Sequence, residues 1–305
     1  MLTYIARRLA VSVVTLLGVT VIAFGLVQML PGDPARTIAG LLASDEDVER
    51  IRTRMGLDEP VLVQYGQFVS RLVTGDLGES ARTRRPVTTE IGARLPKTIE
   101  LAAAGTIIGS VLGIFAGVVA ARFRNRFLDH SVSMGSLIGI SMPVYWLGLL
   151  LIMLFAVNLG WLPAAGADRR TSIILPAFTI GLFTMALVAR MTRSSMLEVL
   201  EQDFVRTAFS KGVADRNVVY RHALRNAFIP VLTVIGIQFG SLLGGAVLTE
   251  FVFAWPGIGR LLVDSIFARD FPVVQGIIIV FALMFIVVNL VVDILYSYVN
   301  PKIQY

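Results

Sequence analysis

Long apolar runs separated by short charged segments dominate the sequence. Crossing the hydrocarbon core of a bilayer takes about 20 apolar residues of helix. Six runs meet this requirement, at residues 9–30, 98–121, 132–157, 172–189, 229–253 and 273–296. Charged residues or Pro/Gly pairs bound each run. The pattern predicts an all-α, polytopic membrane bundle of six transmembrane spans.

Composition agrees with a membrane protein. The 305 residues are 55% hydrophobic and 16% charged, with a mean hydropathy of +0.75, whereas globular domains are roughly 45–50% apolar and about 25% charged. The net charge of +6 does not indicate nucleic acid, because membrane proteins gather basic residues in cytoplasmic loops. The chain has no cysteine and only two distant histidines, His130 and His222, so no thiolate or metal chemistry is expected.

Basic residues in short loops set the expected orientation. They occur between the second and third runs at Arg122, Arg124 and Arg126, and between the fourth and fifth at Arg190, Arg193, Arg206, Lys211, Arg216, Arg221 and Arg225. Both loops should therefore be cytoplasmic. With six spans, both termini, which carry Arg7, Arg8 and Lys302, are also cytoplasmic. The first run is 22 residues long and no small-x-small cleavage site precedes its end, so we interpret it as a retained span.

The long segment 31–97 then lies outside. Residues 61–72 predict a helix with one apolar face, formed by Leu62, Tyr65, Phe68, Val69 and Leu72. We divide the chain into an N-terminal transmembrane helix (1–30), an extracytoplasmic helical insertion (31–97) and a five-span core (98–305). The core includes a cytoplasmic loop at about 190–229 and an outer loop at about 254–272.

Small residues recur every four positions in two of the predicted spans. They are Gly105, Gly109, Gly113 and Gly117 in the second span and Gly236, Gly240 and Gly244 in the fifth. This spacing lets helix backbones approach closely. It fits static packing, and also a surface on which helices slide. Pro143 and Pro176 are candidate kinks in the third and fourth spans.

Ionisable residues are almost absent from the predicted spans. Only Asp293, one turn after Asn289, lies plausibly inside one, and a structural hydrogen bond explains it better than a proton relay does. This argues against an ion-coupled carrier. No phosphate-binding loop and no hydrolase or zinc-protease motif occurs, so an enzyme is not expected and any energy from ATP must come from another chain.

The cytoplasmic loop contains a short amphipathic helix. Asp203 is placed to cap it, and Phe204, Val205, Ala208 and Phe209 form an apolar face opposite Arg206 and Ser210. Gly212 should end the helix in a positive-φ conformation. From periodicity alone, a helix lying on the lipid surface is an equal alternative.

The loop sequence resembles a known family. The stretch Asp203-Phe204-Val205-Arg206-Thr207-Ala208-Phe209-Ser210-Lys211-Gly212, followed by His222-Ala223-Leu224-Arg225, is similar to the coupling loop of bacterial ABC-importer permeases of the dipeptide, oligopeptide and nickel group. Aligned on Gly212, Arg206-Thr207-Ala208 replaces the Glu-Ala-Ala of the general importer loop. That departure is typical of the peptide group.

Further matches follow in the family's order along nearly the whole chain. They are Met29-Leu30-Pro31-Gly32-Asp33-Pro34, Leu95-Pro96-Lys97-Thr98, Ser141-Met142-Pro143-Val144-Tyr145-Trp146, Trp161-Leu162-Pro163, Glu250-Phe251-Val252-Phe253-Ala254-Trp255-Pro256-Gly257-Ile258-Gly259 and Arg269-Asp270-Phe271-Pro272. Each match alone is weak, and their order and spacing together are specific. The chain resembles the first of the group's two permeases.

The resemblance implies a permease subunit in a bacterial inner membrane that forms half of a peptide translocation path. Its partners would be a second, homologous permease, two ABC ATPases that hold ATP and Mg²⁺, an extracytoplasmic binding protein, and lipid. No cofactor is expected in this chain. The same machinery could import nickel chelates, glutathione or oligosaccharides. An uncoupled channel and an intramembrane enzyme are much weaker alternatives.

The resemblance also assigns sites. The coupling loop would use Asp203, Phe204, Val205, Arg206, Thr207, Ala208, Phe209, Lys211 and Gly212. The outer loop would dock the loaded binding protein through Trp255, Pro256, Gly257, Arg260, Asp264, Arg269 and Asp270. No residues are assigned to the substrate path.

Overall fold

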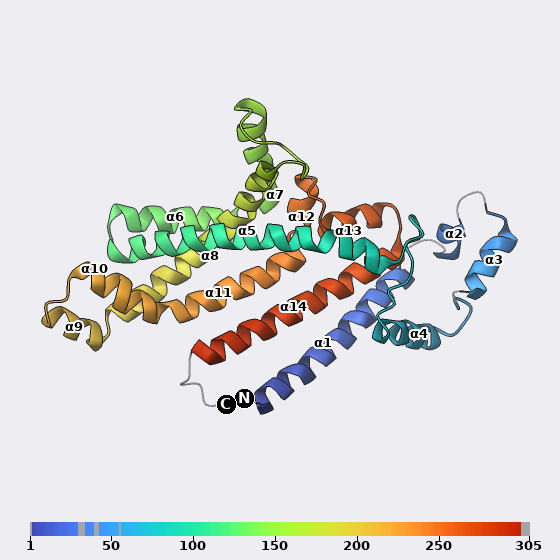
Figure 1. Cartoon of the computed structure of the whole chain (residues 1–305), viewed down its shortest axis with the longest axis horizontal. Helices are drawn as coiled ribbons and strands as arrows, with labels where there is room; N and C mark the ends of the chain where they lie inside the picture. Colours follow the sequence, from blue (N-terminus) through green and yellow to red (C-terminus); the bar gives the residue numbers. More distant parts are fainter. Residues whose placement is uncertain (1, 30–33, 40–42, 55, 300–305) are drawn as a thin grey trace. The chain divides into compact units, whose positions relative to one another are not determined.

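A computed structural model describes residues 2–29, 34–39, 43–54 and 56–299 (Figure 1). The described residues form helices and no strand; the one β-type pairing among them is an isolated bridge between Glu79 and Pro86. The helices are α1 (Leu2–Met29), α2 (Pro34–Ala39), α3 (Asp45–Arg54), α4 (Val61–Val73), α5 (Val87–Arg122), α6 (Phe127–Ser141), α7 (Val144–Leu151), α8 (Ile174–Leu200), α9 (Asp203–Ser210), α10 (Asp215–Asn217), α11 (Leu224–Gly245), α12 (Val247–Val252), α13 (Ile258–Phe267) and α14 (Phe271–Val299).

Three irregular helical turns complete the set. Two π-helical stretches, η1 (Ile152–Asn158) and η3 (Val218–Ala223), extend α7 and lead into α11, and a 3₁₀ turn, η2 (Arg170–Ile173), precedes α8. The all-α prediction is confirmed. The motif residues 30–33 and the basic Lys302 lie outside the described residues.

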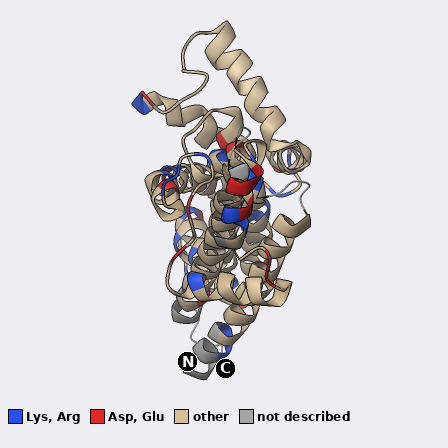
Figure 2. Ribbon diagram, turned by 90° about the vertical axis from the view of Figure 1, so that its right-hand side faces the viewer, with Lys and Arg blue, Asp and Glu red and all other residues tan. Residues whose placement is uncertain are grey.

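Long apolar helices account for the predicted spans. Within the described residues, five continuous helices are long and apolar enough to cross a membrane: Ala10–Met29, Val87–Arg122, Arg170–Leu200, Asp215–Gly244 and Phe271–Ile294. A sixth arises if Phe127–Ser141 and Val144–Asn158 are counted as one broken span. Most of the ribbon in Figure 2 is correspondingly free of charged residues. The predicted polytopic bundle is confirmed.

The third span is broken, which corrects the predicted kink at Pro143. α6 ends at Ser141, Met142 is extended, and the α7 stretch departs at 104°. Pro143 is the N-cap of α7 rather than a residue inside a bent helix. The reason is that proline disfavours the helical conformation of the residue before it.

The predicted kink at Pro176 is wrong. Pro176 is the third residue of α8, where the backbone nitrogen has no intrahelical acceptor, so proline removes no hydrogen bond there. The prolines that do lie inside helices are Pro96 in α5 and Pro230 in α11.

The chain divides into two compact units. The first contains residues 1–97 and 256–286, and the second contains 98–255 and 287–305. The core of the first unit joins α5, α13 and α14 through Val87, Ile91, Ile258, Val273 and Ile277. α4 of this unit packs on α1. Tyr65 meets Phe24 edge-on at 5.6 Å, and its hydroxyl lies 2.9 Å from the Thr20 hydroxyl.

The second unit is built on a close α5–α8 contact. A Cβ added at Gly105, Gly109, Gly113 or Gly117 would lie 2.4–2.8 Å from atoms of α8, closer than real Cβ contacts allow. The predicted close approach is therefore present for this series. In α11, Gly236 meets Val292 of α14 in the same way, whereas Gly244 has no atom within 4 Å. The second series therefore does not form one continuous contact.

Candidate functional site

The short helix α9 lies between α8 and α10, in the loop predicted to be cytoplasmic (Figure 1). Gln202 is its extended N-cap and provides no side-chain cap. Asp203 is the first helical residue rather than the predicted cap, and its carboxylate is exposed 3.7 Å from Arg206. The predicted capping role of Asp203 is therefore corrected.

The predicted apolar face of α9 divides in two. Val205 and Ala208 are buried against Val218 of η3. Phe204 and Phe209 remain 38% and 48% exposed. Because successive helical residues are about 100° apart, the two phenylalanines flank the buried pair on either side. The helix thus uses its smaller apolar residues to hold itself in place and leaves the aromatic rings accessible.

Gly212 ends this segment as predicted, with φ +76°. Its N–H donates to the Phe209 carbonyl at 2.9 Å, and the Val213 N–H donates to the Ala208 carbonyl at 3.2 Å. These two bonds form a Schellman motif. Val213 then packs beside Val205 and Ala208, so the end of the helix is fixed by both hydrogen bonds and apolar contact.

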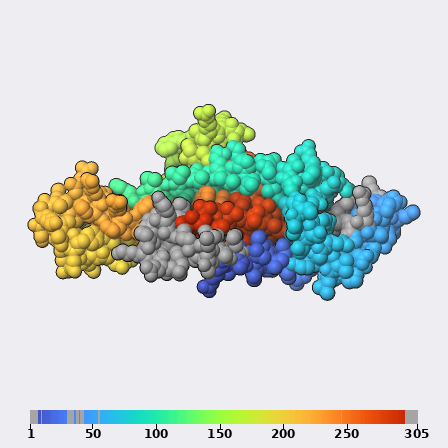
Figure 3. Space-filling model, turned by 60° about the horizontal axis from the view of Figure 1, so that its bottom comes forward, coloured from blue at the N-terminus to red at the C-terminus, as the bar shows by residue number. Residues whose placement is uncertain are grey.

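Exposed residues on α9 and its C-terminal turn define a surface that we call the coupling surface. It consists of Phe204, Arg206, Thr207, Phe209 and Lys211. In Figure 3 this part of the chain, coloured yellow, lies on the visible face of the second unit. Two aromatic rings among cations form a surface suited to a protein groove with an apolar floor and an acidic rim.

Two ion pairs brace the coupling loop against the end of α5. Arg122 contacts Asp215 at 2.7 Å, and Arg124 contacts Glu201 at 2.6 Å. Glu201 precedes α9 and Asp215 follows it, so both sides of the loop are tied. Sequence reasoning used these arginines only to orient the protein. Their partners lie 77 and 93 residues away, and no local pattern marks them.

A buried ion pair joins α6 to α8 nearby. Asp129 is almost fully buried and accepts two hydrogen bonds from the Arg193 guanidinium, one of them 2.8 Å long. The Asn125 backbone N–H donates to the same carboxylate at 2.9 Å. Sequence analysis did not single out this pair. The carboxylate has three donors, which is how a charge is tolerated in a buried position.

The outer-loop residues do not form one exposed set. Trp255 is buried in the second unit among Leu101, Ala177 and Ile180. Gly257 is the buried N-cap of α13. Pro256 is half-buried, while Arg260 and Asp264 are partly exposed on α13, with their charged groups 3.8 Å apart. Arg269 is exposed at the end of that helix.

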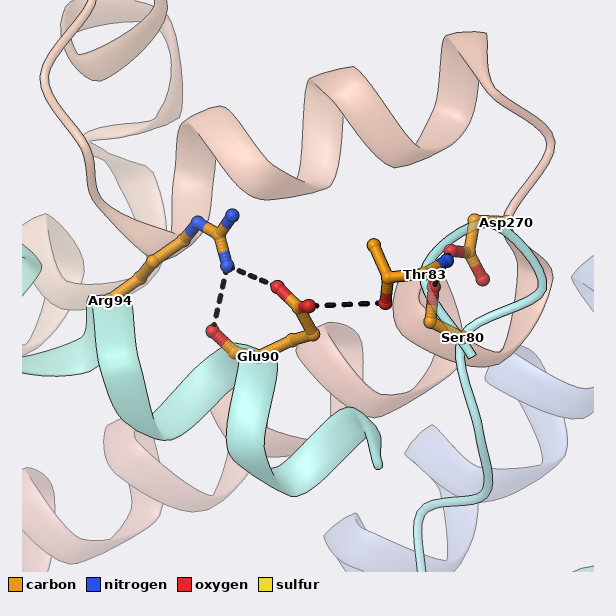
Figure 4. A network of polar contacts seen from close by, with 5 residues as sticks. All are labelled: Ser80, Thr83, Glu90, Arg94 and Asp270. Atoms are coloured by element: carbon orange, nitrogen blue, oxygen red, sulfur yellow. Dashed lines mark hydrogen bonds and ion pairs between the residues drawn. The ribbon is translucent and has the colours of Figure 1, made fainter. Parts of the chain in front are cut away.

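Asp270 is only 3% exposed, so it does not present its charge to a partner. Its carboxylate accepts a hydrogen bond from the neighbouring Ser80 hydroxyl at 2.5 Å (Figure 4). The Ala81 N–H at 3.0 Å and the Arg82 N–H at 3.4 Å donate to the same carboxylate. This network fixes the turn that follows Glu79. We therefore remove Asp270 from the predicted docking residues and assign it a structural role.

The same turn is tied to α5. Thr83 donates its hydroxyl to Glu90 at 3.1 Å, and Arg94 contacts the same carboxylate at 2.5 Å (Figure 4). No group of three or more His, Cys, Asp or Glu side chains that could hold a metal ion occurs within the described ranges.

Comparison with known proteins gives the class. Residues 85–305 match the family described as binding-protein-dependent transport system inner membrane component, and residues 1–102 match the N-terminal family of the same membrane components. The chain belongs to this family. It is a multi-pass membrane permease subunit of an ABC importer, in the peptide-type group.

Curated relatives cover the whole chain. The dipeptide transport system permease protein DppB of Alkalihalophilus pseudofirmus is 44% identical over 333 aligned residues, with 100% of both chains covered. The glutathione transport system permease protein GsiC of Escherichia coli K12 is 48% identical over 305 residues, again with full coverage.

Solved structures support the fold. The chain resembles an inward-facing MetNI methionine ABC transporter with a TM-score of 0.60 and 19% identity, covering 69% of this chain and 96% of that one. An amino acid ABC transporter with histidines matches with a TM-score of 0.56 and 16% identity, covering 69% and 94%.

Proposed function

We propose that this chain forms half of a translocation path for short peptides, driven by ATP hydrolysis on two partner ATPases. A second, similar permease completes the path, and an extracytoplasmic binding protein delivers the substrate. Dipeptides and glutathione, the substrates in the names of two relatives, are both short peptides. Nickel chelates and oligosaccharides remain alternative substrates for the same machinery. Both chain ends face the cytoplasm in this arrangement.

The coupling surface is the observation that carries the proposal. Fully burying a large apolar side chain is worth about 1.5–3 kcal/mol, so burying the 38% of Phe204 and 48% of Phe209 that remain exposed would contribute roughly 1 kcal/mol each. The Schellman turn and the buried Val205–Ala208 pair hold the helix that presents them. A partner that binds this helix differently in two states can shift the conformation of the spans.

The outer-loop docking role is proposed for a reduced set of residues. Arg260, Asp264 and Arg269 are at least partly exposed and can meet a charged binding-protein surface. Trp255, Pro256 and Gly257 would shape the loop from within, because they are buried or half-buried.

The test is a pair of substitutions on the coupling surface. Phe204→Asp places a charge where an apolar groove is expected, so ATPase co-purification should fall at least tenfold while membrane abundance stays normal. Phe204→Leu keeps an apolar side chain and should preserve most of the association. Substrate-stimulated ATP hydrolysis is measured alongside. Wild-type co-purification and hydrolysis in both Phe204→Asp and Phe209→Asp would contradict the proposal.

A further inference from the structure

A cavity of about 510 Å³ lies within the second unit, among α7, α8, α11 and α12. Four polar side chains line it: Tyr145, Gln238, Ser241 and Thr249. Phe183 and Leu242 contribute to its apolar wall. The volume falls in the roughly 300–1,000 Å³ range of small-molecule sites.

The polar lining has no internal explanation. In the part of the chain that the structure describes, the side chains of Tyr145, Gln238, Ser241 and Thr249 make no hydrogen bond. Thr249 is nevertheless only 2% exposed. A polar group in an apolar, membrane-spanning region is costly without a partner. The buried Thr249 therefore indicates a ligand that supplies its missing hydrogen bond, and the half-buried Gln238 and the exposed Tyr145 and Ser241 are accessible polar groups around the same cavity.

The break in the third span opens onto the same cavity. Pro143, Val144 and Tyr145 line it, and α7 begins there without a side-chain cap. The first N–H groups of a helix have no intrahelical acceptor. Irregular backbone at membrane depth is tolerated where it lines a cavity, and broken spans in transporters direct such N–H groups toward substrate oxygens. The break thus adds backbone N–H donors of α7 to the site that the polar side chains line.

The donors and acceptors match a peptide main chain. A glutamine amide both donates and accepts, as do the hydroxyls of tyrosine, serine and threonine. No lining residue is charged, so the site does not select a charged side chain. Apolar walls accommodate varied side chains, whereas the polar groups can hydrogen-bond to the backbone amides that all peptides share.

We propose that this cavity transiently binds the main chain of the peptide during its passage, through Tyr145, Gln238, Ser241 and Thr249. The inference rests on the proposed import of short peptides and extends it to path residues that the sequence left unassigned. The competing explanation is that a helix of the second permease, or a lipid chain, fills the cavity permanently.

Accessibility of a single thiol tests the site in the assembled complex. The natural chain has no cysteine, so Ser241→Cys introduces one reactive group. A charged, membrane-impermeant thiol reagent should label it, and dipeptide turnover with the binding protein and ATP should slow the labelling several-fold. Val287→Cys, at a 51% exposed position on the apolar surface of α14, is the control and should not be labelled. A thiol at position 241 that is unreactive, or that substrate does not protect, would overturn the site.

Transport kinetics give an independent readout. Gln238→Leu removes the amide at similar size, so the KM for dipeptide transport should rise roughly 2- to 10-fold, as expected for one lost hydrogen bond. Leu283→Met, an apolar change at a 48% exposed position on α14 that does not line the cavity, should leave the KM unchanged. ATPase co-purification should be normal in both. An unchanged KM in Gln238→Leu overturns this inference and leaves the importer proposal intact, whereas a wild-type complex that imports no short peptide overturns both.

Discussion

Gly212 has a backbone conformation in the coupling loop that residues with a side chain rarely adopt. Its φ of +76° is costly for any residue with a Cβ, by about 1–2 kcal/mol, although the space around the Cβ position is open. Gly212→Ala should therefore reduce coupled ATP hydrolysis mildly. Gly212→Val should reduce it strongly, because a β-branched side chain adds strain, while membrane abundance stays normal.

A second glycine with a similar positive φ serves as a control that separates the effect of backbone strain from the effect of its position in the coupling loop. Gly75, in the first unit, has φ +79° and equally open surroundings. Gly75→Val imposes the same backbone strain away from the coupling loop and should keep ATPase co-purification. If Gly212→Val behaves like Gly75→Val in coupled hydrolysis, the turn is not part of energy transmission.

Two aspartates near the outer loop should respond differently to removal. Asp270→Ala leaves the Ser80 O–H and the Ala81 N–H without an acceptor, at a cost of about 1–3 kcal/mol, and should lower the thermal stability of the purified complex. Asp264→Ala breaks only a partly exposed pair at 3.8 Å and should cost less than about 1 kcal/mol. Equal stability of the two variants would show that the Asp270 network is dispensable.

The sequence indicated which residues form the amphipathic helix α9, but it did not indicate which of them are exposed. The amphipathic pattern correctly marked α9 and its glycine. It could not separate Val205 and Ala208, which bury, from Phe204 and Phe209, which do not, because the partner residue Val218 belongs to a different helix. Asp270 was misplaced for the same reason, since its donors lie about 190 residues earlier in the sequence.

At the level of elements, the apolar runs predicted the spans well, and proline predicted their irregularities poorly. Pro143 ends one helix and starts another, Pro176 fits the first turn of α8, and Pro230 sits inside α11. The effect of a proline depends on its distance from the helix start. That start is decided by packing, which hydropathy does not record.

The glycines of α5 provide a direct test of close packing. Gly109→Ala would place a Cβ 2.5 Å from the Gly181 carbonyl oxygen, so α5 and α8 must separate, at about 1–3 kcal/mol. Gly244→Ala, in α11, meets no atom within 4 Å and should be neutral or slightly stabilising. Thermal unfolding in detergent compares them. A Gly109→Ala variant as stable as Gly244→Ala would favour the alternative of a sliding surface.

At the level of the whole molecule, the predicted orientation rests on basic residues in the loops expected to be cytoplasmic. Reporters active in the cytosol should work when fused after Asn125 or Asp215, and reporters that need export should work after Glu59, Asp168 or Asp264. Both kinds of reporter are fused at each site, and the reporter that is expected to be inactive there serves as the control. Export activity at Asp215 would place the coupling surface on the wrong side of the membrane for an ATPase.

Family membership was also accessible from the sequence, because motif order extends along nearly the whole chain, and the family matches span it as well. The substrate path was not accessible. Tyr145, Gln238 and Thr249 come from three separate helices, and each is unremarkable in its own segment.

The α5–α8 contact has a consequence for genetics. Every missense change in a glycine codon introduces a side chain, so no amino-acid substitution in the series preserves the contact. At Gly105 the two closest atoms belong to the Ile180 side chain, at 2.4 and 2.6 Å, with the Ala177 carbonyl oxygen at 3.3 Å, so a smaller residue at 180 should relieve most of the clash in Gly105→Ala. At Gly109 and Gly117 carbonyl oxygens of α8 obstruct at 2.5 and 2.6 Å. No codon change in α8 deletes a carbonyl, so selection for revertants at these two positions should return glycine itself.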